Sequence, residues 1–377
     1  MDNIFELQDV TFAYNSRPPN IMDGFNLEIE RGKRTAILGC NGAGKSTLFY
    51  LLTGVNKPQQ GQVLYNGEPI EYTRDKLREL RSDVAIVLQN PDEQIFCSLV
   101  EEDIAFGPLN IGMDRDEVEV RVQKALKDVR MTGYEKRPLP HLSGGQRKRI
   151  AIAGALVMDP KIMIMDEPTA GLDPQASMEV MELAEKLALR GITVLLSTHE
   201  MDLAYKWNDV SKILCQGKVE FTGNCDEFFG DLNNVYKCGL LTPSVYNMNK
   251  DISLIEGQDM DPYPHNICEF VAKFGKNDES GRLLLVPSES EDAKGKFDSL
   301  SNDMKGCSVG IYGSDVRHEL GDREIEYLFD GLDGCFTEVV KGNDAVLFYD
   351  PIYETTINNQ ITRLKTFGFD VKREEMR

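Results

Sequence analysis

The sequence contains no long hydrophobic run and begins without the features of a secretion signal. Its longest uncharged apolar stretch, Ile150–Met158, is far shorter than the roughly 20 residues that a transmembrane helix needs. The first residues, Met1-Asp2-Asn3, provide neither the basic nor the apolar region of a signal peptide. We therefore expect a protein that is made and kept in the cytosol, with no membrane span of its own.

Cysteine pairs and positive charge are also scarce. The eight cysteines are scattered without a Cys-x-x-Cys pair, which favours reduced thiols over a disulfide framework or a zinc site. The chain has 42 basic and 62 acidic residues and a net charge of −20. Because nucleic-acid phosphates repel an acidic surface, this balance argues against nucleic acid as a partner.

The length of 377 residues is sufficient for two or three domains. Charge divides unevenly along it: residues 1–225 have 26 basic and 33 acidic side chains, and residues 226–377 have 16 and 29. We therefore predict a first domain over 1–225, a linker over 226–264 and a smaller α/β domain over 265–377.

Short apolar runs alternate with segments of helical period in both parts of the chain. Strands are expected at 4–10, 25–29, 35–38, 63–65, 84–88, 162–165, 193–197, 283–286, 308–312 and 345–349. Helices are expected at 46–53, 114–130, 143–158, 175–190, 289–304, 322–340 and 354–367. This alternation predicts an α/β fold, with a parallel sheet that helices cover on both faces.

The strongest local signal is a glycine-rich loop between an expected strand and an expected helix. It fits the pattern G-x-x-x-x-G-K-[ST], in which backbone amides and a helix N-terminus cradle phosphate oxygens. Lys45 would reach the β- and γ-phosphates of a nucleotide, and Ser46 would ligate Mg²⁺. The loop consists of Gly39, Cys40, Asn41, Gly42, Ala43, Gly44, Lys45, Ser46 and Thr47.

A second signal is the apolar strand Ile162–Met165, which delivers two acids, Asp166 and Glu167, at its C-terminal end. Open α/β sheets place their ligands at such ends. Asp166 is suited to the Mg²⁺ shell, and Glu167 to a base that orients the attacking water. Strands often end in acids, so this pair carries weight mainly because it follows a phosphate-binding loop.

A third signal is the pentapeptide Leu142–Gln146, which opens the helix expected at 143–158. Ser143 can cap that helix, and the two glycines expose its N-terminal amides. With this pentapeptide, the chain resembles the ATP-binding cassette (ABC) ATPases over about residues 1–225. The resemblance implies that an opposing subunit presents this signature to the γ-phosphate of ATP, through Ser143, Gly144, Gly145 and Gln146.

Other positions match the same family in order. Tyr14 matches the aromatic residue that stacks on adenine, and Gln89 matches the Q-loop glutamine that senses Mg²⁺ or water. Asp173 lies in the match to the D-loop, and His199 matches the histidine that holds the γ-phosphate. The resemblance thus implies an ATP-hydrolysing enzyme of the P-loop fold with a helical subdomain, which uses ATP and Mg²⁺. It assigns catalysis to Glu167, His199 and Gln89, and Mg²⁺ binding to Ser46, Gln89 and Asp166.

Four further segments, 89–96, 100–108, 147–156 and 168–174, resemble one branch of this family. They are similar to the ATPases of energy-coupling factor (ECF) importers, including the cobalt/nickel CbiO type. That resemblance implies a second ATPase subunit, either another copy or a paralogue, a transmembrane T component and a substrate-binding S component. The chain would then lie at the cytoplasmic face of the cell membrane and drive uptake of a transition-metal ion or a vitamin.

The residues after the Q-loop predict a surface for that membrane partner. Ile95, Phe96, Leu99 and Val100 are apolar and stand beside three acids at 101–103. An apolar groove rimmed by acids suits basic amphipathic helices. The alternative is that these apolar residues only pack the helical subdomain.

Residues 265–377 show no phosphate-binding loop, no G-x-G-x-x-G pattern and no set of metal ligands. Three roles stay open for this domain: dimerisation, regulation by a ligand, and docking of another protein. For the whole chain, the alternative from another class is a soluble ABC ATPase that works without a membrane partner. One cassette and no long coiled-coil insertion are less typical of that class.

Overall fold

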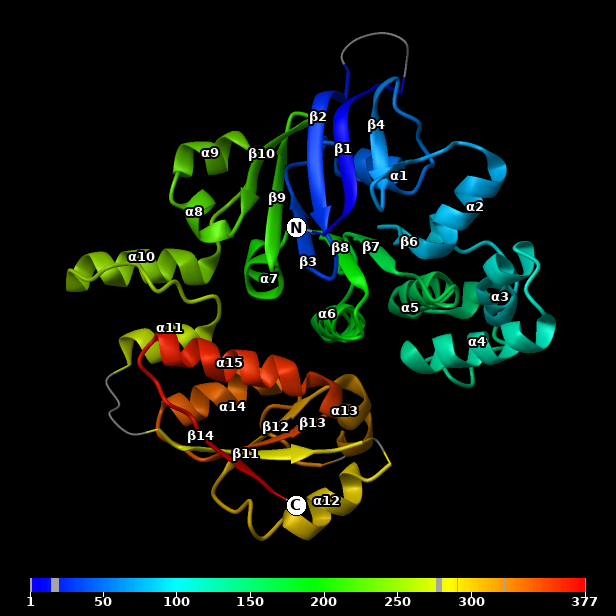
Figure 1. Cartoon of the computed structure of the whole chain (residues 1–377). Helices are drawn as coiled ribbons and strands as arrows, with labels where there is room; N and C mark the ends of the chain where they lie inside the picture. Colours follow the sequence, from blue (N-terminus) through cyan, green and yellow to red (C-terminus); the bar gives the residue numbers. More distant parts are fainter. Residues whose placement is uncertain (1, 15–19, 276–279, 290, 322, 377) are drawn as a thin grey trace. The chain divides into compact units, whose positions relative to one another are not determined.

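The computed structural model describes residues 2–14, 20–275, 280–289, 291–321 and 323–376. The chain divides into two compact units, Met1–Thr242 and Pro243–Arg377 (Figure 1). This division differs from the predicted end of the first domain at residue 225. The stretch expected as a linker, 226–264, is helical in large part and includes α10 (Ser244–Glu256).

The first unit contains two sheets. The larger has the strand order β10-β9-β3-β8-β7-β6 and is parallel except for the pair β10 and β9. The smaller is antiparallel, with the order β2-β1-β4-β5. The predicted parallel sheet is thus confirmed for the larger sheet, but the strands expected at 4–10, 25–29 and 63–65 belong to the antiparallel one. The strands are β1 (Asn3–Phe12), β2 (Met22–Glu30), β3 (Arg34–Leu38), β4 (Gln60–Tyr65), β5 (Glu68–Pro69), β6 (Val84–Val87), β7 (Ile162–Asp166), β8 (Thr193–Ser197), β9 (Val210–Cys215) and β10 (Lys218–Gly223).

Burial explains the two kinds of strand. In β2, Phe25, Leu27 and Ile29 are buried while the residues between them are exposed, because one face of the antiparallel sheet meets water. Every residue of β7 and β8 is buried, as expected for central strands with both faces covered. Each of these short strands ends in a polar residue that follows an apolar run. Because the strands are parallel, these polar residues lie at the same edge of the sheet.

The larger sheet separates two hydrophobic cores. Ile164 of β7 packs in the core shared with the antiparallel sheet and α1. Its neighbours Met163 and Met165 point into the core that contains residues of α3, α4, α5 and α6. The helices of this unit are α1 (Lys45–Leu52), α2 (Arg74–Asp83), α3 (Val100–Asn110), α4 (Arg115–Asp128), α5 (Gly144–Leu156), α6 (Pro174–Leu189), α7 (Met201–Trp207), α8 (Cys225–Phe229) and α9 (Leu232–Lys237).

The second unit is built on an all-parallel sheet of order β12-β13-β11-β14. Leu284 and Val286 pack with α12 and α13, while α14 covers the sheet from the other side (Figure 1). The small α/β domain expected here is present, although α14 begins later than the helix expected at 322–340. Its elements are α11 (Ile267–Phe274), β11 (Arg282–Pro287), α12 (Ala293–Leu300), β12 (Ser308–Tyr312), α13 (Ser314–Leu320), α14 (Gly331–Val340), β13 (Ala345–Tyr349), α15 (Glu354–Thr366) and β14 (Lys372–Glu375). Residues 290 and 322 of the expected helices lie outside the described residues.

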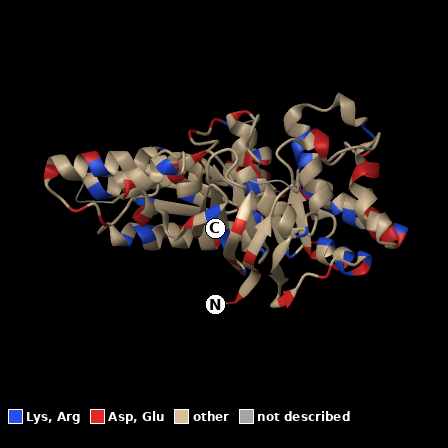
Figure 2. Ribbon diagram, turned by 90° about the horizontal axis from the view of Figure 1, so that it is seen from above, with Lys and Arg blue, Asp and Glu red and all other residues tan. Residues whose placement is uncertain are grey.

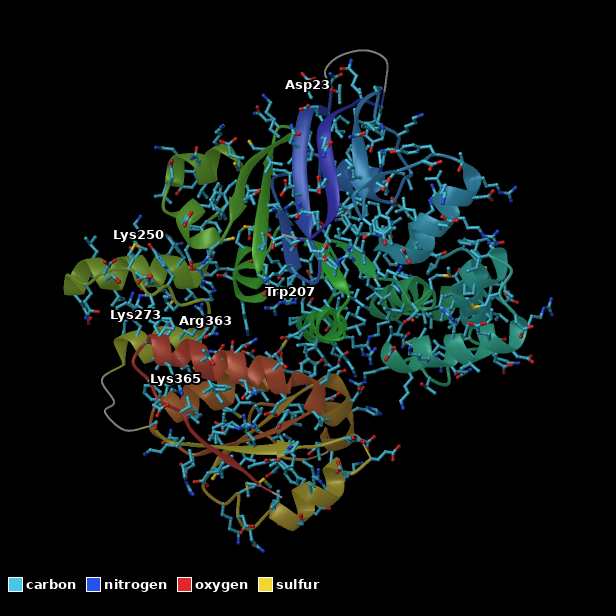
Figure 3. All side chains as sticks on the ribbon, viewed as in Figure 1. Asp23, Trp207, Lys250, Lys273, Arg363 and Lys365 are labelled. Carbon is cyan, nitrogen blue, oxygen red and sulfur yellow. The ribbon has the colours of Figure 1, made fainter. Side chains whose placement is uncertain are left out.

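A buried polar network joins α11 to α15 in the second unit. Glu269 is 1% exposed, and Arg363 donates to its two carboxylate oxygens at 2.8 and 2.7 Å. Lys273 of α11 donates to Asn249 Oδ1 at 2.8 Å and to three backbone carbonyls; Lys273 and Arg363 are labelled in Figure 3. Pairing with Arg363 thus offsets the cost of burying the Glu269 carboxylate.

Basic and acidic residues are both scattered over the ribbon (Figure 2). Among the described residues, no helix combines the length and apolar character required to cross a membrane.

Candidate nucleotide-binding and catalytic site

The glycine-rich loop connects β3 to α1, as its sequence predicts. Gly39 has a φ of 151°, and a Cβ there would lie 2.4 Å from the Leu214 carbonyl oxygen, so the position requires glycine. Lys45 is 6% exposed and its Nζ donates to the carbonyl of Gly39 at 2.7 Å and to that of Cys40 at 3.3 Å. Burial lowers the pKa of Lys45, although the carboxylates of Glu167 and Asp166 oppose the shift.

The end of β7 brings Asp166 to the first turn of α1. Ser46 Oγ donates to Asp166 Oδ2 at 2.8 Å, across 120 residues of sequence. Ser197 Oγ, at the end of the neighbouring strand β8, donates to Asp166 Oδ1 at 2.5 Å. Two of the three predicted Mg²⁺ ligands, Ser46 and Asp166, are therefore adjacent.

The donor set near Asp166 fits Mg²⁺ rather than a metal held by protein ligands alone. Within the described ranges, no group of three or more His, Cys, Asp or Glu side chains could hold a metal ion. Mg²⁺ typically takes one or two protein oxygens and completes its shell with nucleotide phosphates and water. The hydroxyl of Ser46 and the carboxylate of Asp166 are oxygen donors of this kind.

Glu167 lies at the centre of the candidate catalytic group. Its φ is 45°, a left-handed conformation that costs a non-glycine residue free energy. Ser197 holds this backbone, because the Glu167 N–H bonds to Ser197 Oγ at 3.0 Å. Gln89 Nε2 donates to Glu167 Oε2 at 2.8 Å, and His199 Nε2 pairs with Glu167 Oε1. Gln89, Glu167 and His199 thus converge from β6, β7 and β8.

The signature segment begins α5 as predicted. Ser143 Oγ accepts from Gln146 N at 3.3 Å, while Gln146 Oε1 accepts from Ser143 N at 3.0 Å, which completes a capping box. Gly144 has open space where a Cβ would stand. The segment therefore presents the N-terminus of α5 with bare glycine backbone.

The two remaining predicted positions lie on the edges of the site. Tyr14 is 56% exposed, its ring meets Phe12 edge-on at 5.1 Å, and its hydroxyl lies 3.3 Å from Thr47 Oγ1. This leaves a ring face available above the first turn of α1. Asp173 caps α6, because its Oδ1 accepts from Ala176 N at 2.8 Å.

A cavity of about 370 Å³ opens where residues 89–92 meet the N-terminal turns of α5 and residues 170–172. It lies beside the catalytic group, since Gln89 is among the residues that line it. The lining is Gln89, Asn90, Pro91, Asp92, Gly144, Arg147, Lys148, Ala170, Gly171 and Leu172.

Sequence reasoning missed two side chains of this region. Ser197 was contained in an expected strand, and only its position two residues before His199 hinted at the site. Lys148 falls within the helix predicted at 143–158, but it is 1% exposed, and burial lowers its pKa to about 8. No pattern in the sequence marks a lysine as buried among acids.

Comparison with known proteins relates this geometry to a family. The sequence model of the ABC transporter family matches residues 22–170. The energy-coupling factor transporter ATP-binding protein EcfA of Methanocaldococcus jannaschii is 44% identical over 245 residues, which are 65% of this chain and 88% of that protein. The chain belongs to the ABC ATPases of the energy-coupling factor type. A putative ABC transporter ATP-binding protein of Methanothermobacter thermautotrophicus is 41% identical over 270 residues, 71% of this chain and 95% of that protein.

Solved structures agree with this membership. CbiO1 from Clostridium perfringens, part of the cbiONQ transporter complex, matches with a TM-score of 0.57 and 38% identity, covering 68% of this chain and all of CbiO1. The ATP-binding cassette MJ0796, solved as a dimer with ADP and Pi, matches with a TM-score of 0.54 and 28% identity, covering 58% of this chain and 98% of MJ0796. The predicted P-loop ABC fold and ATPase activity are therefore confirmed for this EcfA-type chain.

Proposed function

We propose that this chain is the ATP-hydrolysing subunit of an ECF-type importer and that it works as a dimer on the cytoplasmic face of the membrane. The convergence of Gln89, Glu167 and His199 carries this proposal, because these three groups surround the place where water would attack a γ-phosphate. All three predicted catalytic side chains are retained, which favours an active subunit over a degenerate one.

ATP binding would use the loop Gly39–Thr47, with the adenine stacked on the exposed face of Tyr14. The Lys45 ammonium, now bonded to two loop carbonyls, would turn to the β- and γ-phosphate oxygens. Ser46, Asp166 and Gln89 would hold Mg²⁺, which neutralises charge that develops on the phosphates. Ser197 would keep the Asp166 carboxylate oriented for that role.

Hydrolysis would proceed from the contacts of Glu167. Its carboxylate would accept a proton from the attacking water, and Gln89 would hold that carboxylate through its amide. His199 lies on the other oxygen of Glu167 and would turn its Nε2–H to the γ-phosphate, where it would stabilise negative charge in the transition state. Fixing these groups before reaction lowers the entropic cost of aligning the water.

A second subunit is part of the proposal because of the signature segment. The side-chain hydrogen bonds of Ser143 and Gln146 run within the segment and to Tyr134. Its bare helix N-terminus is suited to the γ-phosphate of ATP held by another copy or a paralogue. Asp173 would lie at the same interface between the two subunits. Closure around two ATP molecules would then move the helical subdomains, and hydrolysis would release them.

The surface after the Q-loop supports the membrane partners. Phe96 is 64% exposed and Phe106 is 45% exposed, and their rings meet edge-on at 4.6 Å. Val100 is fully buried in the helical core, so the prediction that it lines the groove is wrong. We infer that Phe96 and Phe106 receive a helix of a transmembrane T component, which in turn contacts an S component.

The proposed cargo is a transition-metal ion such as cobalt or nickel, or a vitamin. The metal ion follows from the resemblance of segments 89–96, 100–108, 147–156 and 168–174 to the cobalt/nickel CbiO type. The S component would select between them, since the site described above holds only the nucleotide.

The test is affinity capture of the tagged chain from gently solubilised membranes, with partners identified by mass spectrometry. We expect a polytopic T-like protein, a small S-like protein and one or two ATPase species. One species indicates a homodimer, and two indicate a heterodimer. Capture of soluble proteins alone, with ATPase activity intact, would overturn the importer in favour of a soluble ABC ATPase.

A further inference from the structure

A buried lysine lies between the signature helix and the Q-loop. Lys148 is in the second turn of α5, two residues after the signature segment, and its side chain is 1% exposed. Its Nζ donates to the carbonyl of Leu88 at 2.9 Å and to that of Gln89 at 2.8 Å. The mechanism proposed above uses Gln89 and leaves this lysine without a role.

The contact continues from the backbone of Gln89 to the catalytic group. The carbonyl of Gln89 is held by Lys148, and the side-chain amide of the same residue is 2.8 Å from Glu167. Because one residue carries both bonds, a shift of its backbone moves the amide relative to the Glu167 carboxylate. Lys148 is therefore one residue removed from the group that activates water.

Two other contacts join α5 to the loop that follows Gln89. Gln94 donates to the carbonyl of Ala151 at 3.1 Å, and Arg147 pairs with Asp92 at 2.9 Å. Both lie further along the loop than Gln89. Among these three side chains, Lys148 is the one that binds the backbone of Gln89 itself.

We propose that Lys148 is a positioning residue for hydrolysis. It holds the backbone of Gln89 so that the Gln89 amide stays hydrogen-bonded to Glu167, and it makes this placement depend on the position of α5. The inference rests on the proposed dimer. There, the N-terminus of α5 touches ATP in the opposing site, whereas Gln89 and Glu167 serve the ATP of their own chain. Lys148 thus ties closure around one ATP to alignment of the base at the other.

The test compares Lys148→Met, which keeps the length but removes the donors, with Lys148→Arg, which keeps charge and donors. The matched control is Lys124→Met, since Lys124 is exposed on α4, which packs against α5. Each is made in the full chain, and kcat, KM, ATP dissociation constant and the Hill coefficient for ATP are measured. For Lys148→Met we expect kcat to fall about ten- to hundredfold, the ATP dissociation constant to change less than about threefold, and the Hill coefficient to approach one.

Lys148→Arg should recover most of the lost kcat, and Lys124→Met should match the unmodified chain. A double variant, Lys148→Met with Gln89→Ala, separates positioning from simple stabilisation. If Lys148 acts through Gln89, the double variant is no slower than Gln89→Ala alone. The inference is overturned if the double variant loses kcat by the product of the two single losses. It is also overturned if the kcat of Lys148→Met equals that of the control.

Should Lys148→Met fail to fold, Lys148→Gln replaces it in the same comparison, with the same two outcomes. Failure of this inference is distinguishable from failure of the proposed importer. An unmodified chain that hydrolyses ATP but captures no membrane protein contradicts the importer only. An unmodified chain that captures its partners and hydrolyses ATP, with Lys148→Met unaffected, contradicts the role of Lys148 only.

Discussion

At the scale of single residues, Glu167 shows how an acid at a strand end acquires a catalytic setting. Its left-handed backbone is held by Ser197, and its two carboxylate oxygens face Gln89 and His199. Gln89, after β6, and His199, after β8, constrain the carboxylate from two sides, so the acid has one defined direction. A carboxylate so restrained is better placed to take a proton from water than one on a mobile loop.

Replacing Glu167 with Gln keeps the shape of the side chain but removes the base. We expect kcat to fall by about 10²- to 10⁴-fold, because general-base catalysis contributes about that much. ATP binding should persist, and the dimer should accumulate in its closed, ATP-bound form. Steady-state hydrolysis and size-exclusion chromatography with ATP check this, and turnover at the unmodified rate would contradict the role of Glu167.

A second prediction at this scale concerns Ser197, which is fully buried. Ser197→Ala removes the donor to Asp166 and one acceptor of the Glu167 N–H. Leaving buried polar groups unpaired costs about 1–3 kcal/mol of unfolding free energy. We expect that loss in chemical denaturation, together with a lower kcat. Ser299→Ala, which affects an exposed hydroxyl in the second unit, is the control and should change neither quantity.

At the scale of elements, the Q-loop and α3 form a short surface rather than an open apolar groove. Asp103 accepts from the N–H groups of Phe96 and Cys97 at 2.8 and 2.9 Å, so it shapes the loop that presents the ring. Glu102 caps α3 through the N–H of Leu99. These acids were expected to form the rim, and two of them instead hold the backbone that exposes Phe96.

Phe96→Asp tests this surface. The exposed ring contributes to no core, so we expect nucleotide binding and the unfolding free energy to stay within about 0.5 kcal/mol of the unmodified chain. A buried charge at the partner interface would cost several kcal/mol, and membrane proteins should be lost from the captured complex. Val55→Asp, at an apolar residue that is 58% exposed elsewhere in the unit, is the control. Equal recovery of partners with Phe96→Asp would reject the docking surface.

At the scale of the whole molecule, every predicted site residue lies in the first unit. The second unit has its own parallel sheet and its own core. Nucleotide should therefore stabilise the first unit alone, because a ligand stabilises only the structure that binds it.

We expect calorimetry of the full chain to resolve two transitions. Saturating ADP at about 100 times its dissociation constant should stabilise the first unit by about 2.7 kcal/mol and raise only its transition temperature. A variant with Lys45→Ala serves as the control and should show no shift. A single transition, or an equal shift of both, would mean that the second unit is coupled to nucleotide binding and would favour a regulatory role for it.

Local patterns in the sequence did not predict β9 and β10, but they were enough to predict the family, the phosphate-binding loop and four strands of the larger sheet, β3, β6, β7 and β8. These depend on local patterns: glycines where left-handed backbone is needed, apolar runs where strands are buried on both faces, and acids at strand ends. The separation of β1, β2 and β4 into an antiparallel sheet depends on pairing between distant segments. A period of two shows one covered face but not which strand lies beside it.

Which of the predicted residues meet depends on how distant strands pair. Gln89, Glu167 and His199 are far apart in the chain, and parallel pairing of β6, β7 and β8 brings them together. Tertiary packing also buried Val100 while leaving Phe96 exposed, although both are apolar and four residues apart. The same packing placed Lys148 against the Q-loop, where two backbone carbonyls replace the water that an exposed lysine would bind.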